Sequence, residues 1–269
     1  MTENPALTPS RAADLELALT LADIADRLAL QHFRAEDLVI ETKPDLTPVT
    51  EADRGVEQAL RAQLAEHRPA DSILGEEFGA QGDSSRRWIL DPIDGTKNYV
   101  RGVPVWACLI ALLEGDDVTV GVVSAPALSR RWWAAKGGGA FVSDPTSAQP
   151  RRLQVSRVAR LGDASFSYSD QVGWSERGAA GALEALLHRT WRQRGYGDFW
   201  SHMMVAEGLV DVAGEPQLES YDMAALVPIV EEAGGRMTAF DGRTALAGGS
   251  ALSSNGVLHD EVLALMGDD

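Results

Sequence analysis

The chain has 269 residues, of which 45% are hydrophobic and 24% are charged, a balance typical of a globular protein with a sizeable core. Its net charge of −16 repels nucleic acid and anionic lipid, so we expect neither a nucleic-acid-binding nor a membrane protein. Cys108 is the only cysteine, which excludes an intramolecular disulfide, and its apolar surroundings predict a buried thiol. The chain shows no signal-peptide pattern and no apolar run of membrane-spanning length, so we expect a cytoplasmic protein.

Apolar residues at helical spacing predict a helix over residues 12–33 and a second one through Val56 that ends near Pro69. Two short apolar runs follow, in SILGEEFG and RRWILDPIDG, and each predicts a strand that ends in acidic residues and glycine. Residues 103–136 alternate apolar runs with turn signals, which predicts antiparallel strands joined by hairpins. The glycines at 137–139 are typical of a hairpin turn.

The loop DPTSAQP is the candidate boundary between two closely packed halves, residues 1–150 and 151–269. In the second half, apolar spacing predicts helices around residues 176–188, 199–208, 222–233 and 259–266, with strands in LVDVAG and RMTAF. Pro228 should kink the third of these helices, because proline removes one helical hydrogen bond. Mixed helices and strands throughout predict an α/β (α+β) fold class.

The segment DPIDGT places Asp91 and Asp94 three residues apart, directly behind an apolar strand. A tight surface turn, an aspartyl nucleophile site and a hard-metal site would each account for it, and the fragment alone favours the turn. Nucleophilic-aspartate sites of the haloacid-dehalogenase type place their two carboxylates two residues apart, so that interpretation weakens.

Further acidic residues favour the metal site. Glu76 ends the preceding strand, and three carboxylates supply the oxygen ligands that Mg²⁺ prefers. Crowded carboxylates repel one another unless a cation neutralises them. Gly95 and Thr96 offer backbone N–H donors to a phosphate if a helix begins there. The sequence therefore predicts a site that holds a metal and an anion together.

Four segments, PVTEAD at 48–53, GEE at 75–77, DPIDGT at 91–96 and YDMAA at 221–225, together resemble the inositol monophosphatase superfamily of Mg²⁺-dependent, Li⁺-sensitive phosphatases. The resemblance covers nearly the whole chain. It implies alternating αβαβα layers, a site at the junction of the two halves, two or three Mg²⁺ ions per subunit and a homodimer. The family commonly has Trp where this chain has Tyr221, but the following aspartate is present.

The resemblance also implies residue roles. The metal ligands would be Glu76, Asp91, Asp94, Asp222 and the backbone carbonyl of Ile93. Asp53 and Thr96 would orient or deprotonate an attacking water, with Glu76 assisting, and the N–H groups of Gly95 and Thr96 would hold the phosphate. Lys43 matches a basic family position near the third metal, although a solvated loop lysine is an equally simple interpretation. The substrate would be a small phosphomonoester.

By resemblance, residues 192–200 and Glu215 form the pocket for the leaving alcohol, next to Asp94. Asp198 stands where inositol phosphatases often have a small hydroxyl residue, and a carboxylate beside Glu215 suits a cationic substrate. Arg194 is a further candidate for substrate contact. These features resemble the histidinol-phosphate phosphatases of the superfamily, in their actinobacterial form, and imply hydrolysis of L-histidinol phosphate in histidine biosynthesis.

Several of these residues have a simpler alternative role. Asp198 could merely cap the helix at 199–208, Glu215 could face solvent, and Arg194 could pair with an acid in the pocket wall. The enzyme could be an inositol-1-monophosphatase or a broad sugar-phosphate phosphatase. A regulatory protein associated with RNA polymerase is a non-enzyme alternative, against which the complete ligand set argues. The five histidines lack metal-binding spacing, and His202 is interpreted as an ordinary core histidine near the pocket helix.

Overall fold

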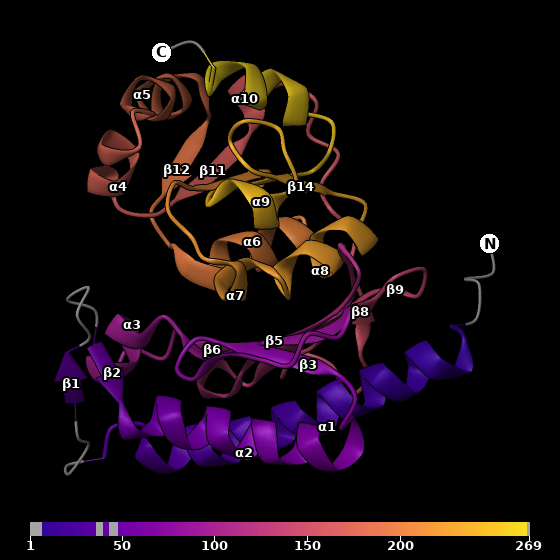
Figure 1. The fold of residues 1–269 in the computed structure, drawn as a ribbon. Coiled ribbons are helices and arrows are strands. Elements are labelled where there is room, and N and C mark those ends of the chain that lie inside the picture. The colour runs from indigo at the N-terminus through magenta and orange to yellow at the C-terminus, as the bar shows by residue number, and fades with distance from the viewer. Residues whose placement is uncertain (1–6, 36–39, 43–47, 268–269) are drawn as a thin grey trace.

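The computed structural model describes residues 7–35, 40–42 and 48–267. Figure 1 shows five stacked layers that alternate between helices and sheets, so the expected αβαβα arrangement is confirmed. One outer layer contains α1 (Pro9–His32) and α2 (Glu51–His67). The central layer contains α6 (Asp198–Ala206), α7 (Ser220–Met223) and α8 (Leu226–Glu232). The other outer layer contains α4 (Gln171–Glu176), α5 (Ala180–Arg189) and α10 (His259–Leu265).

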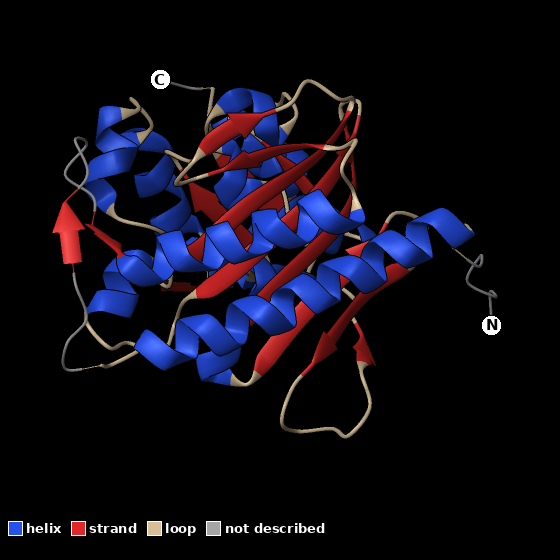
Figure 2. Ribbon diagram, turned by 60° about the horizontal axis from the view of Figure 1, so that its bottom comes forward, coloured by secondary structure: helices blue, strands red, loops and turns tan. Residues whose placement is uncertain are grey.

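Helices α1 and α2 lie side by side across one face of the first sheet (Figure 2). The Thr8 side chain accepts a hydrogen bond from Arg11 N, and Pro9 occupies the first turn of α1, where proline is tolerated. Leu21 of α1 and Leu60 of α2 are fully buried against the sheet. The two helices expected at the start of the chain are therefore present.

The first sheet has eight strands in the order β10-β9-β8-β7-β6-β5-β3-β4. Its strands are β3 (Ser72–Gly75), β4 (Gly79–Gln81), β5 (Arg86–Asp94), β6 (Ala107–Glu114), β7 (Asp117–Ala125), β8 (Arg130–Ala135), β9 (Gly139–Ser143) and β10 (Arg151–Arg152). Neighbours run antiparallel except for β3 and β5. The expected hairpins are present, and Gly137 with a φ of 83° lies in the turn from β8 to β9.

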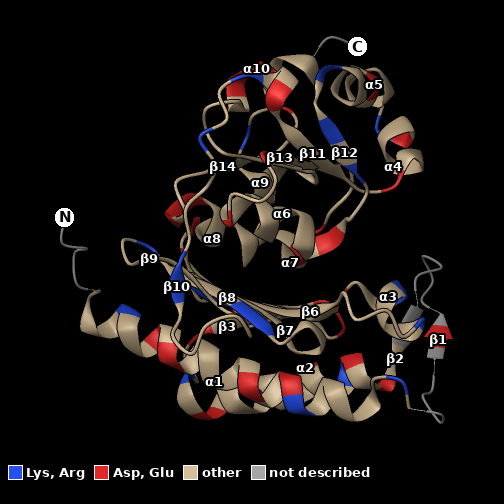
Figure 3. Cartoon of the chain, turned by 180° about the vertical axis from the view of Figure 1, so that it is seen from behind, with Lys and Arg blue, Asp and Glu red and all other residues tan. Residues whose placement is uncertain are grey.

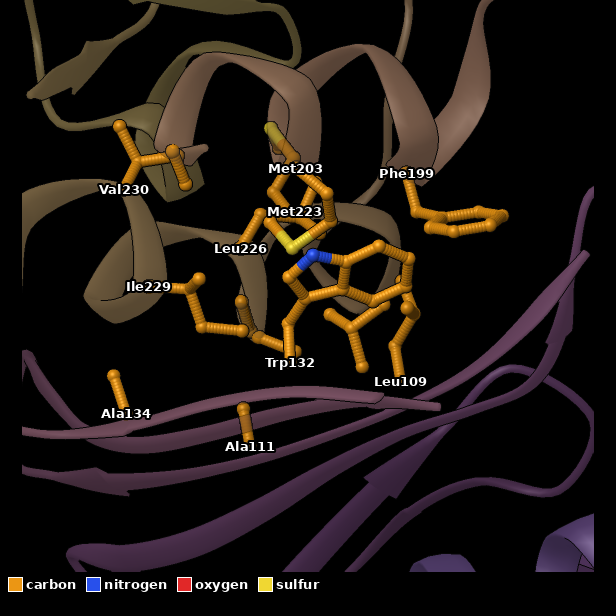
Figure 4. Packing of buried hydrophobic residues seen from close by; sticks show 14 of the residues in the cluster. Leu109, Ala111, Trp132, Ala134, Phe199, Met203, Met223, Leu226, Ile229 and Val230 are labelled. Atoms are coloured by element: carbon orange, nitrogen blue, oxygen red, sulfur yellow. The ribbon is translucent and has the colours of Figure 1, made fainter. Parts of the chain in front are cut away.

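Both faces of this sheet are buried, which explains the unbroken apolar run in β6. Leu109 and Ala111 face the central helices, as Figure 4 shows, and Ile110 belongs to the cluster under α1 and α2. Cys108 lies in the same cluster as Ile110 and is buried, as expected.

The two halves meet through close packing of α8 on β7. A Cβ at Gly121 would lie 2.3 Å from the backbone oxygen of Ala225 and 2.7 Å from Pro228 Cγ, so only glycine allows this approach. Trp132 rises from β8 among the side chains of the central helices (Figure 4) and donates a 3.0 Å hydrogen bond to Glu207. The central layer, which comes from the second half of the chain, therefore packs closely on the first sheet.

The second sheet has the order β12-β11-β13-β15-β14. Its strands are β11 (Ser165–Tyr168), β12 (Arg192–Arg194), β13 (Val212–Glu215), β14 (Arg236–Thr238) and β15 (Ala251–Ser254). The helix expected around residues 176–188 is present as α5, which begins four residues later, at Ala180; the shorter α4, which was not predicted, ends at Glu176, and Gly178 between them adopts a φ of 79°. A left-handed glycine ends the first helix before the second begins.

The helix expected at 222–233 is divided into α7 and α8. Pro228 lies in the first turn of α8, where its missing N–H cannot bond to the carbonyl of Ala224. The helical hydrogen bonding is interrupted there, although Ala224 and Ala225 keep right-handed helical dihedral angles. The remaining elements are short: β1 (Ile40–Thr42), β2 (Pro48–Thr50), α3 (Thr96–Val100), α9 (Ala245–Gly248) and the 3₁₀ turns Pro126–Leu128 and Leu161–Asp163.

The loop at residues 144–150 lies between β9 and β10, and β10 still pairs with β9 in the first sheet. The division into residues 1–150 and 151–269 stays a prediction. Among the helices of the described residues, none has the length and apolar character needed to cross a membrane.

Candidate active site

A bulge in β5 turns Asp91 and Asp94 toward the same place. Asp91 pairs with Leu109 of β6 and Asp94 with Ala107, so β5 has one residue more than its partner between these two pairs. In a regular strand, residues three apart point to opposite faces, and a bulge reverses that relation. Asp91 Oδ1 accepts a 3.0 Å hydrogen bond from Ile93 N inside the bulge. The extra residue in the bulge therefore lets two aspartates that are three positions apart point to the same side.

Asp222 reaches the same place from the second half. It occupies the third position of α7 in a capping box, where its Oδ2 accepts a 2.7 Å hydrogen bond from Glu219 N. One carboxylate oxygen each from Asp91, Asp94 and Asp222 lie within 4.8 Å of one another. The structure thus brings together three of the predicted metal ligands.

Glu76 lies in the turn after β3, and Glu57 of α2 holds this turn in place. The fully buried Glu57 carboxylate accepts hydrogen bonds from Glu77 N at 2.7 Å and Phe78 N at 3.2 Å. A Cβ at Gly75 would lie 1.9 Å from Glu57 Oε1, which explains the glycine before the two glutamates. Glu76 lines the same cavity as Asp94 and Asp222. Burial raises the pKa of Asp53, Asp91 and Asp222, and the charge of Glu76 raises each further.

Asp53 occupies the third position of α2 in a second capping box. Its Oδ2 accepts hydrogen bonds from Thr50 N at 2.8 Å and Thr50 Oγ1 at 2.6 Å, whereas its buried Oδ1 has no partner among the described residues. Burial raises the pKa of Asp53 to about 6. Thr96 Oγ1 donates to the backbone oxygen of Ile93 at 2.9 Å, and no hydrogen bond joins the described residues Asp53 and Thr96. Their joint role stays a prediction.

The cluster is electrostatically suited to a divalent cation. Burial raises the pKa of Asp91 well above its usual range, and Glu76 and Asp94 raise it further. Burial likewise raises the pKa of Asp94 and brings that of Asp222 to about 7. Carboxylates this close are costly unless a cation neutralises them, and Mg²⁺ binds such oxygens. The residues present therefore fit Mg²⁺, the metal typical of the family identified below.

A cavity of about 1080 Å³ extends from this cluster between the two halves. Figure 3 shows acidic residues on and beside α7, in the layer between the sheets. The lining includes residues of the metal cluster, the segment after it, the turn before α6 and the end of β13: Glu76, Asp94, Gly95, Thr96, Lys97, Asn98, Tyr168, Asp170, Tyr196, Gly197, Asp198, Glu215, Tyr221 and Asp222.

Asp198 lines this cavity from a strained backbone. Its φ of 51° lies in the left-handed region, which a residue other than glycine rarely adopts. The alternative that Asp198 merely caps α6 is wrong, because Gly197 is the N-cap residue and no side chain there caps the helix. Instead Asp94 Oδ2 accepts from Phe199 N at 2.9 Å, and Asn98 Nδ2 donates to Asp198 Oδ2 at 3.2 Å.

Glu215 ends β13 and is 4% exposed, so the alternative of a solvent-facing glutamate is wrong. Burial raises its pKa well above the usual range, Asp198 and Asp222 raise it further, and the backbone N–H of Asp198 lowers it. Burial also raises the pKa of Asp198, and the nearby charge of Lys97 cancels part of this rise. Two carboxylates, the buried Glu215 and the partly buried Asp198, therefore line the cavity beside the metal cluster, close enough for their charges to raise the pKa of Asp94.

Arg194 is exposed on the edge strand β12 and does not line the cavity, so the structure does not bring it to Glu215. Its Nη1 donates to the backbone oxygen of Gln193. Lys43 lies outside the described residues. Sequence reasoning missed Glu57 and Asn98 as residues of the site. Their positions could have indicated them, because Glu57 follows Asp53 by one helical turn and Asn98 closely follows the DGT motif.

A model of the inositol monophosphatase family matches residues 11–268. The chain is 58% identical over 251 residues to a histidinol-phosphatase of Mycobacterium tuberculosis, with 93% of this chain and 96% of the relative covered. It is 54% identical over 263 residues to a histidinol-phosphatase of Streptomyces coelicolor, with 96% and 98% covered. The solved structure of an IMPase from Thermotoga maritima matches with a TM-score of 0.83 at 32% identity, covering 94% of this chain and 96% of the other.

These matches span both halves and include every motif on which the resemblance was based. The chain belongs to the inositol monophosphatase family.

Proposed function

We propose that this protein is a Mg²⁺-dependent phosphatase that hydrolyses L-histidinol phosphate to L-histidinol and phosphate, a reaction of histidine biosynthesis. The observation that carries the choice of substrate is a pair of carboxylates that line the cavity beside the metal cluster, the partly buried Asp198 and the buried Glu215. A substrate with an ammonium group and a protonatable imidazole neutralises these charges, whereas a neutral polyol does not. The names of the two actinobacterial relatives support the same substrate.

Asp91, Asp94 and Asp222 would hold Mg²⁺, with Glu76 and the backbone oxygen of Ile93 as further ligands. When bound, Mg²⁺ would neutralise charge on the phosphoryl oxygens and lower the pKa of the attacking water. We expect two or three ions per subunit and inhibition by Li⁺. The phosphate would lie beside these carboxylates, where β5 meets α7.

Asp53 is suited to accept the proton of the attacking water. Its Oδ1 is buried and unpartnered within the described residues, and a pKa of about 6 lies near the operating pH, as an efficient general base requires. Thr96 would orient the water, and Glu76 would assist. The N–H groups of Gly95 and Thr96 stand at the start of α3, where the helix itself provides no acceptor, so they would bind phosphate oxygens.

The test compares kcat/KM for L-histidinol phosphate and inositol 1-phosphate with purified protein and Mg²⁺. We expect at least about a hundredfold preference for the cationic substrate, because two charge-assisted contacts are at stake. Asp198→Thr should reduce this preference. Asp83→Asn, which removes an exposed carboxylate outside the cavity lining, is the matched control. Equal use of the two esters would refute the choice of substrate.

We further propose that the protein is a cytoplasmic homodimer, as the family resemblance implies. Light scattering of the purified protein at physiological salt tests the dimer. Adding nucleic acid in the same experiment should leave the mass unchanged, because a net charge of −16 opposes such binding.

A further inference from the structure

Behind the cavity wall, His202 of α6 faces Glu215 of β13 in a buried environment. His202 Nε2 lies 3.8 Å from Glu215 Oε1, and neither atom has a hydrogen-bond partner among the described residues. Buried polar atoms are almost always paired. Two such atoms that face each other across less than 4 Å indicate a hydrogen bond that forms only in another state of the protein.

The surroundings of the ring fix its orientation. His202 Nδ1 lies 2.7 Å from Ser253 Oγ of β15. Ala213 pairs with Ser253, so Ser253 and Glu215 project from the same face of the second sheet, toward α6. Burial lowers the pKa of His202 to about 4, which leaves the ring neutral, with one nitrogen as donor and the other as acceptor. A hydroxyl that donates to Nδ1 places the ring proton on Nε2, toward Glu215.

We propose that His202 is a positioning residue for substrate recognition: its Nε2–H donates to Glu215 Oε1 when a cationic leaving group binds, and so holds this carboxylate ionised and oriented toward the cation. The inference rests on the proposed function, because it gives His202 a part in recognising the ammonium or imidazolium of the substrate. A displacement of about 1 Å closes the 3.8 Å gap to an ordinary hydrogen bond.

Glu215 needs such a donor, because its other neighbours oppose its charge. Asp198, Asp222 and Asp170 all raise its pKa, and the backbone N–H of Asp198 lowers it. A carboxylate stays ionised in a buried place when hydrogen bonds to its charged form accumulate. The N–H of His202 supplies a second one from behind the wall, which leaves the cavity side of the carboxylate for the substrate.

The test is a double-mutant cycle of His202→Leu and Glu215→Gln, with His202→Gln as the conservative variant. His202→Leu should raise KM for L-histidinol phosphate about tenfold and leave kcat within about twofold. KM for p-nitrophenyl phosphate, which has no cation, should change by less than about twofold. His202→Gln keeps an N–H near the position of Nε2 and should restore KM to within about threefold of the wild type. In the Glu215→Gln background, His202→Leu should have no further effect.

A purely structural role for His202 predicts other results, namely equal changes for both esters and the same effect of His202→Leu in either background. Either result would overturn the inference. If His202→Leu does not fold, Ser253→Ala removes only the partner of Nδ1 and should raise KM for L-histidinol phosphate about threefold, and an unchanged KM also overturns the inference.

Failure of the proposed function is a separate outcome. It would appear as a wild-type enzyme without preference for L-histidinol phosphate over neutral esters. The double-mutant cycle is then measured with the ester that the wild type hydrolyses best. If His202→Leu changes KM equally with and without Glu215→Gln, the coupling between His202 and Glu215 is refuted.

Discussion

The cavity has two neighbouring groups of carboxylates: the metal end, with Asp91, Asp94 and Asp222, and the leaving-group end, with Asp198 and Glu215. At the metal end, each aspartate accepts one backbone N–H, but burial and like charges still raise the pKa of Asp91 well above its usual range. At the leaving-group end, Asp198 accepts from Asn98 and lies near Lys97, and Glu215 lies beside the N–H of Asp198 and His202. We therefore expect the metal end to need an external cation, whereas side chains of the protein offset part of the charge at the leaving-group end.

Removing one carboxylate from the metal end should have the largest effect. Asp91→Asn should lower kcat/KM more than about 1000-fold at saturating Mg²⁺, since several kcal/mol of transition-state charge stabilisation depend on the cation. The melting temperature without Mg²⁺ should not fall, because a buried, crowded charge is lost. Asp83→Asn, an exposed aspartate between β4 and β5, is the control. Turnover within tenfold of the wild type would show that Asp91 holds no essential ion.

At the leaving-group end, the effect should be smaller and selective. Glu215→Gln should lower kcat/KM for L-histidinol phosphate about 10- to 100-fold, because a charge-assisted contact to the substrate is lost. Hydrolysis of p-nitrophenyl phosphate should change by less than about threefold. Steady-state kinetics with both esters make the comparison. A parallel loss for the two would mean that Glu215 serves the chemistry common to all esters.

Glu57 supports the metal end without lining the cavity. Glu57→Gln places an amide N–H₂ against the backbone donors of the turn after β3, so Glu76 in this turn should be displaced. We expect kcat to fall about tenfold and the free energy of unfolding to fall by about 1–3 kcal/mol. Urea unfolding and kcat are the measurements. Glu66→Gln on the exposed side of the same helix is the matched control. Unchanged kcat with reduced stability would limit Glu57 to a structural role.

The smallest effect concerns pH and stability without metal. Folding raises the pKa of Asp222 from 3.8 to about 7 and that of Asp53 from 3.8 to about 6. Between these values the folded state binds more protons than the unfolded state, so stability falls as pH rises from about 4 to about 7. The melting temperature of the metal-free protein should decrease over this range, and Mg²⁺ should reverse the loss at the upper end. Asp222→Asn should flatten the slope. A rise with pH would contradict these shifts.

The sequence predicted the metal end better than the leaving-group end for a physical reason. Asp91, Asp94 and Glu76 follow apolar strands, and such a pattern indicates where the side chains go. Local segments therefore specify most of the metal end. The bulge that aligns Asp91 with Asp94 depends on the pairing of β5 with β6, which no local pattern reveals.

The leaving-group end depends on contacts between distant residues. Asp198 meets Asn98, one hundred positions earlier, and His202 meets Ser253 and Glu215 on two strands of the second sheet. The structure also assigns the cap of α6 to Asp94, a residue of the first half, although Asp198 is the nearer candidate in sequence. Local patterns do not specify such partners.

The 2.9 Å hydrogen bond from Phe199 N to Asp94 makes the two halves mutually dependent. Strand β5 supplies the residue that caps α6, and α7 in turn supplies Asp222 to the aspartates of β5. A chain cut in the loop at residues 144–150 would therefore yield two fragments that are each inactive. Recovery of phosphatase activity on mixing them would report their reassociation, which makes this fold a candidate for a split-enzyme sensor.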